Sequence, residues 1–158
     1  MGPEPLLRLA RQASILGLIL CLGVYVGVLV GVAFSWWVYA LHLLAMVTLA
    51  PVALAMAQQA DAEGASLSPL ARWRHPWSLL RQLSVPARTG VVLAMAFFLV
   101  HFVWWAVMVT TGVDVPAGVL DGPALRVFSA GWTMGFAVVI AFAPALTARR
   151  NELDAADA

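Results

Sequence analysis

Every Arg, Asp and Glu in this sequence lies outside four long apolar stretches, and the chain contains no Lys. Each stretch has about the 20 residues that a helix needs to cross the hydrocarbon core of a bilayer. Backbone groups in lipid must satisfy one another, which leaves only helices or a closed β-barrel. Barrel strands would be about ten residues long with alternating polarity, a pattern that these runs lack. The sequence therefore predicts four transmembrane helices, at about 13–34, 37–57, 89–111 and 127–147.

The composition excludes several classes of protein. Hydrophobic residues make up 63% of the chain and charged residues only 11%, against about 25% charged residues in an ordinary soluble domain. Disorder is excluded because it requires low hydrophobicity and high charge. The lone cysteine, Cys21, excludes a disulfide-stapled secreted module. A net charge of +1 without a basic domain argues against a nucleic-acid partner.

The placement of arginine predicts how the spans are oriented. Of the nine arginines, only Arg126 lies on the side of the predicted spans away from the two termini. Since basic loops stay in the cytoplasm, both termini are expected there. We therefore expect one membrane domain over residues 1–158. It would be an all-α integral membrane four-helix bundle, N-in/C-in, with a cytoplasmic loop at 58–88 and an acidic tail at 151–158. The abundance of Ala, Val and Arg suggests a bacterial cytoplasmic (inner) membrane.

The long loop between the second and third spans mixes Arg with Trp. Trp favours the headgroup level of a membrane and Arg pairs with phosphate, so we expect this segment to lie in the membrane interface and to contact lipids. The alternative is a docking surface for a cytoplasmic partner. The residues expected at the headgroups are Arg72, Trp73, Arg74, Trp77, Arg81 and Arg88.

Glycines recur every four residues in the first span, at Gly23, Gly27 and Gly31. Small residues let helices approach closely in lipid, where hydrophobicity does not drive them together. The stripe predicts a packing surface for a helix of this chain, of a second copy or of another protein. A lipid or a flat cofactor is a further alternative. Gly131 and Gly135 repeat the pattern once in the fourth span.

His42 and His101 are the only readily ionisable groups well inside the predicted spans. An ionisable residue inside a membrane is a functional hypothesis by default. The second and third spans are antiparallel and consecutive, so we expect them to be neighbours. Two neutral imidazoles facing each other would then suit the iron of a haem b, an arrangement similar to that in four-helix membrane cytochromes of the b type. The alternative is that each His hydrogen-bonds to a neighbouring carbonyl or hydroxyl.

We assign no catalytic residue and no metal ligand, because the predicted spans contain no acidic or basic residue other than histidine. The sequence predicts a non-enzymatic integral membrane subunit or accessory protein. It would pack against membrane partners through the glycine stripe, as a homo-oligomer or in a larger complex. The alternative is an electron-transfer subunit of an oxidoreductase, with haem held by His42 and His101. The uncharged spans disfavour a transporter or channel fragment.

Overall fold

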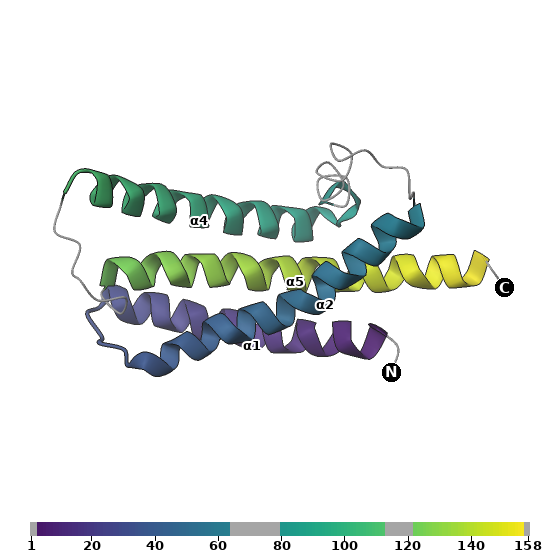
Figure 1. Ribbon diagram of the computed structural model, residues 1–158, viewed down its shortest axis with the longest axis horizontal. Helices are drawn as coiled ribbons and strands as arrows, with labels where there is room; N and C mark the ends of the chain where they lie inside the picture. Colours follow the sequence, from purple (N-terminus) through teal and green to yellow (C-terminus); the bar gives the residue numbers. More distant parts are fainter. Residues whose placement is uncertain (1–2, 64–79, 113–121, 157–158) are drawn as a thin grey trace.

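The computed structural model describes residues 3–63, 80–112 and 122–156. These residues form four long α-helices, with a 3₁₀ turn, η1 (Trp36–Val38), ahead of the second. Each helix contains a segment long and apolar enough to cross a membrane. This confirms the helical fold for this part of the chain, and four helices that are apolar enough to cross a membrane indicate an integral membrane protein. Figure 1 shows the helices α1 (Pro3–Leu29), α2 (Tyr39–Glu63), α4 (Val85–Thr110) and α5 (Gly122–Ala156).

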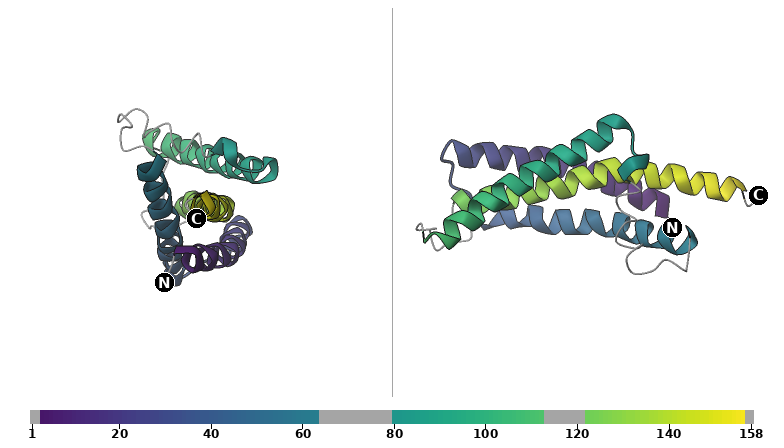
Figure 2. Two further views of the ribbon diagram at one scale, coloured as in Figure 1. Left: turned by 90° about the vertical axis from the view of Figure 1, so that its right-hand side faces the viewer. Right: turned by 90° about the horizontal axis from the view of Figure 1, so that it is seen from above.

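The last helix, α5, lies at the centre of the molecule, and the other three surround it, as the end-on view in Figure 2 shows. α5 packs against all three of them, and α1 and α2 also pack against each other. Within the described residues, α2 and α4 do not pack extensively against each other. The expectation that the second and third spans are close neighbours is therefore not met, because each of the two helices packs mainly on other helices.

The two ends of the bundle differ in which connections they carry. Both chain termini lie at one end, here called the terminal end (Figure 1). The link between α1 and α2 lies at the other end, here called the connecting end. By the arginine argument, the terminal end is the one expected to face the cytoplasm.

α1 and α5 pack against each other along their buried faces, here called the α1–α5 seam, and the Phe136 ring of α5 lies against Gly17 of α1. Buried positions recur alternately three and four residues apart on both helices, the spacing that keeps one face toward a partner. The seam of α1 consists of Leu7, Ala10, Ser14, Gly17, Cys21, Val24 and Val28. The buried positions of α5 with this spacing are Leu125, Ser129, Trp132, Phe136, Val139, Ala143 and Leu146.

The buried apolar side chains form two clusters, and α4 contributes to only one of them. The first cluster draws on all four helices, through residues such as Leu7, Val52, Val91 and Phe142. The second cluster, which includes Cys21, draws on α1, η1, α2 and α5. α4 is therefore held by apolar burial mainly near its first half, where Val91 and Ala94 are its buried residues.

Gly31 ends the first helix earlier than the sequence predicted. α1 stops at Leu29 rather than near Phe34, and Gly31 takes the left-handed conformation with φ +82°. The Gly31 amide donates to the Val28 carbonyl at 3.2 Å, and the Val32 amide donates to the Gly27 carbonyl at 2.9 Å. This pair of bonds is the Schellman arrangement, which satisfies the last carbonyls of a helix and favours glycine at the left-handed position.

Candidate functional site

His101 joins α4 to α1 through a cluster of three rings, Tyr25, Phe97 and His101. Its Nδ1 lies 2.8 Å from the Phe97 carbonyl oxygen, and its Nε2 lies 2.8 Å from the Tyr25 hydroxyl. A carbonyl can only accept, so Nδ1 carries the proton and Nε2 accepts the hydrogen bond from Tyr25. The Tyr25 ring also stands edge-on to Phe97, with ring centroids 5.1 Å apart.

This three-ring cluster holds the half of α4 that lacks apolar burial. Two further contacts tie the same half of α4 to α5. The Arg126 guanidinium lies 5.9 Å from the centre of the Trp104 ring, and the Phe98 ring lies against Gly131. An interhelical hydrogen bond in a membrane is worth about 0.6 kcal/mol on average and up to about 1.7 kcal/mol. Each contact therefore contributes little free energy, but together they hold the half of α4 that has no buried apolar side chain.

His42 joins α2 to α5 through Trp132. The indole N–H of Trp132 donates to Nδ1 of His42 at 2.9 Å. Because an indole nitrogen only donates, Nδ1 of His42 is unprotonated and the proton of the neutral ring is on Nε2. Phe128 packs edge-on to the same imidazole, with ring centroids 6.4 Å apart.

The structure does not bring the two histidines together, since His42 contacts α5 and His101 contacts α1. A metal-binding imidazole presents an unprotonated nitrogen to the metal. Nε2 of His101 is already the acceptor for Tyr25, and Nε2 of His42 carries the ring proton. The axial-ligand hypothesis for a haem therefore receives no support from this geometry. The hydrogen-bonded alternative describes His101, whose Nδ1 donates to a backbone carbonyl.

Within the described residues, the glycine stripe predicted in the first span does not pack against another helix. A Cβ added at Gly23 would meet no atom within 4 Å. Gly27 faces Phe34 of the following loop, whose Cζ would lie 2.5 Å from such a Cβ. Gly31 lies beyond the helix, as its cap. The three glycines thus have three different surroundings.

The two glycines of the fourth span lie against neighbouring helices. A Cβ at Gly131 would lie 3.4 Å from Phe98 of α4, and one at Gly135 would lie 3.4 Å from Leu49 of α2. Both distances lie at the lower limit of ordinary van der Waals contact, so α5 approaches its neighbours closely at both positions.

Sequence reasoning missed Gly17, the glycine on which the α1–α5 seam depends. A Cβ there would lie 2.4 Å from Cζ of Phe136, whose side chain is fully buried. The signal was present in the sequence as small residues three and four apart, at Ala10, Ser14, Gly17 and Cys21. The Ser14 hydroxyl is buried without a hydrogen-bond partner among the described residues, so Ser14 serves here as a small side chain.

Only part of the predicted interfacial segment falls within the described residues. Arg72, Trp73, Arg74 and Trp77 lie outside them. Arg81 is exposed, and Arg88 is half-buried in the first turns of α4. Both lie at the terminal end, as expected for side chains that reach the membrane surface.

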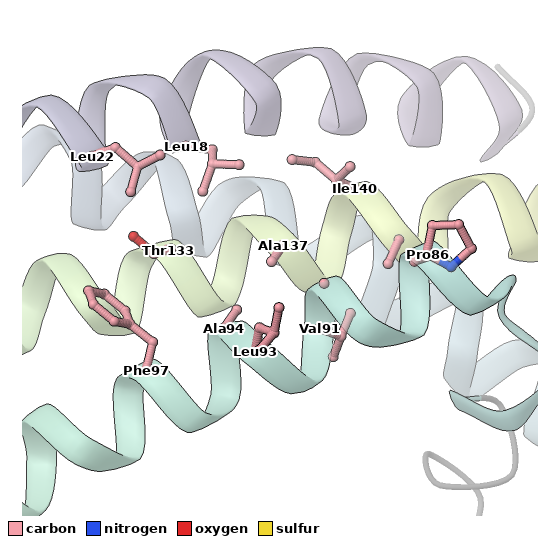
Figure 3. A pocket seen from close by; sticks show the side chains of 13 residues that line it. Leu18, Leu22, Pro86, Val91, Leu93, Ala94, Phe97, Thr133, Ala137 and Ile140 are labelled. Atoms are coloured by element: carbon pink, nitrogen blue, oxygen red, sulfur yellow. The ribbon is translucent and has the colours of Figure 1, made fainter.

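An apolar groove of about 440 Å³, here called the α1–α4 groove, lies along the spans. α1 and α4 form its walls and α5 forms its floor, as Figure 3 shows. Leu18 and Leu22 reach into it from α1, and Phe97 closes it toward the connecting end. None of its lining residues is charged. The α4 wall and the α5 floor include five small residues among larger apolar ones, namely Ala87, Gly90, Ala94, Ala137 and Ala141.

No protein-family model, curated protein or solved structure matches this chain.

Proposed function

We propose that this chain is a non-catalytic integral membrane subunit that binds one uncharged transmembrane helix of a partner protein in the α1–α4 groove. The observation that carries the proposal is the incomplete packing of α4. This helix buries only Val91 and Ala94, and it leaves a groove lined by small residues beside α5. Helices in lipid associate through packing, so an unfilled groove between two helices favours a third helix as its occupant.

The small residues favour a helix over an acyl chain. Gly90 lies on the groove, and a Cβ added there would meet no atom within 4 Å. Glycine and alanine bring backbones close enough for extensive van der Waals contact. A flexible lipid chain gains no comparable benefit from a smooth backbone surface. The groove extends along α4 from Pro86 to Phe97, or about 16 Å at the helical rise per residue.

The polar groups of the spans support the same proposal. The imidazoles of His42 and His101 are used to hold helices of this chain together. Once the two imidazoles are assigned to contacts within the chain, the groove and its small residues remain as features that can bind a partner by packing. This role also replaces the glycine stripe of α1 as the contact surface, because Phe34 covers Gly27 and Gly31 lies beyond the end of the helix, which leaves Gly23 as the open glycine within α1.

Site-specific photo-crosslinking in native membranes tests the proposal. A photoreactive residue at Leu93, which lines the groove, is expected to give a discrete adduct with a partner polypeptide. The matched control is Val92, which is also exposed but does not line the groove. Val92 is expected to give lipid adducts only. Gly90→Leu, which fills the groove, should abolish the Leu93 adduct.

Two outcomes would overturn the proposal. Lipid adducts alone at Leu93 would show that the groove holds acyl chains. An adduct with the mass of two copies of this chain would show that the occupant is a second copy rather than a partner.

A further inference from the structure

A second hollow, of about 350 Å³, lies between α1 and α5 at the terminal end. It is separate from the α1–α4 groove, and it is here called the arginine hollow. Its lining includes Arg8, Arg11 and Leu7 of α1, and Ala143, Thr147 and Asn151 of α5. The two helices pack tightly at Gly17 and Phe136. The hollow lies between them on the terminal side of that contact.

The hollow combines positive charge with hydrogen-bonding groups. Arg8 pairs with Glu4, which is also in its lining. Arg11 has no carboxylate within ion-pair distance among the described residues, so its guanidinium is available to an anion. Thr147 donates its hydroxyl proton to the Ala143 carbonyl at 2.9 Å, which leaves its oxygen free to accept a hydrogen bond.

The floor of the same hollow is apolar. Leu7 and Ala143 are only 3% and 2% exposed, and both belong to the apolar cluster shared by all four helices. A free inorganic anion or an acidic peptide makes no use of such a floor. An amphiphile does, because its charged head meets the arginines while its glycerol and first methylenes cover the apolar atoms.

The position of the hollow agrees with a lipid. Arg11 lies just before the uncharged part of the first span, and Thr147 lies just before Arg149 and Arg150, where the uncharged part of the last span ends. These residues therefore lie at the level of the headgroups. Basic pockets between transmembrane helices on the cytoplasmic side bind anionic headgroups.

From these observations we infer that the arginine hollow binds the phosphate of an anionic phospholipid, with Arg11 as its principal contact. Arg8 and the Asn151 amide supply further donors. The Thr147 oxygen accepts from a headgroup hydroxyl. The lipid would bridge α1 and α5 at the membrane surface.

The experiment uses the full chain in a neutral detergent and measures lipid binding by native mass spectrometry during titration with phosphatidylglycerol. Arg11→Gln should weaken binding by at least about tenfold, the loss expected for a charge-assisted hydrogen bond. The matched control is Arg88→Gln, the same charge change at the same end but outside the hollow. It should weaken binding by no more than about fivefold, the effect of one surface charge. Ala148→Trp fills the hollow without changing charge, and it should also abolish binding.

Three outcomes would overturn the inference. Equal losses of lipid affinity in Arg11→Gln and Arg88→Gln would show that the lipid responds to the overall surface charge and not to the arginine hollow. Equal binding of phosphatidylcholine would show that the headgroup charge is not recognised. Competition by inorganic phosphate or by a soluble polyglutamate peptide at concentrations similar to those of the lipid would show that the apolar floor plays no part. Circular dichroism and the elution profile of each variant establish that it is folded.

Discussion

Gly17→Ala provides a direct test of the α1–α5 seam. The new Cβ would lie 2.4 Å from Cζ of Phe136, whereas ordinary contacts begin at 3.4 Å. The overlap is therefore 3.4 − 2.4 = 1.0 Å. The Phe136 ring is fully buried, so it cannot swing aside, and α1 must shift instead. Overpacking of this kind typically costs about 1–3 kcal/mol.

Gly23→Ala is the matched control, since it makes the same change in the same helix where a Cβ meets nothing within 4 Å. Both variants gain the same helix propensity, about 1 kcal/mol for Gly to Ala. Their difference in unfolding free energy therefore isolates the steric cost, and we expect Gly17→Ala to be about 1–3 kcal/mol less stable than Gly23→Ala.

Unfolding by sodium dodecyl sulfate in mixed micelles measures this difference, with the fluorescence of the chain's tryptophans, including the buried Trp132, as the signal. Shortening the ring partner in the double variant Gly17→Ala, Phe136→Leu should recover part of the loss, because neighbouring substitutions are not additive. Equal stabilities of Gly17→Ala and Gly23→Ala would refute the close approach of α1 to α5 at this point.

Three further predictions concern the polar contacts and the helix cap. Tyr25→Phe removes the donor to His101 and should lower the unfolding free energy by about 0.6–1.7 kcal/mol; an unchanged value would mean that the bond does not hold α4. Gly31→Ala places a Cβ at φ +82° and should cost about 1–2 kcal/mol in the same titration, unlike Gly23→Ala. The reduced-minus-oxidised optical spectrum of the purified protein should show no b-type band. A stoichiometric band lost in both His42→Ala and His101→Ala would restore the haem hypothesis.

The four spans could be predicted because charge is excluded from lipid whatever the helices pack against. The absence of Arg, Asp and Glu from the apolar stretches marks the membrane directly. The end of the first helix could not be predicted from hydropathy, because Gly31 and the residues after it are as apolar as those before. Its position depends on backbone geometry, which hydropathy does not record.

The neighbours of each helix were harder to predict for a related reason. In a soluble bundle the apolar face of a helix identifies its buried side, but both faces of these helices are apolar. Chain order suggested that the spans carrying His42 and His101 would meet, whereas their helices pack on α5 and not extensively on each other. The size of the side chains, rather than their polarity, indicates which face of α1 is buried, because the small residues around Gly17 lie on that face.

The central place of α5 bears on how the chain is made. Synthesis proceeds from the N-terminus, so α1, α2 and α4 enter the membrane before the helix that each of them packs against. Until α5 follows, only the pairing of α1 with α2 is available among the extensive contacts between helices. α4 in particular has no extensive packing partner at that stage, because its main partner, α5, is synthesised after it. Ribosome stalling or premature termination before residue 122 would thus leave three inserted helices without an assembled bundle, as substrates for membrane quality control.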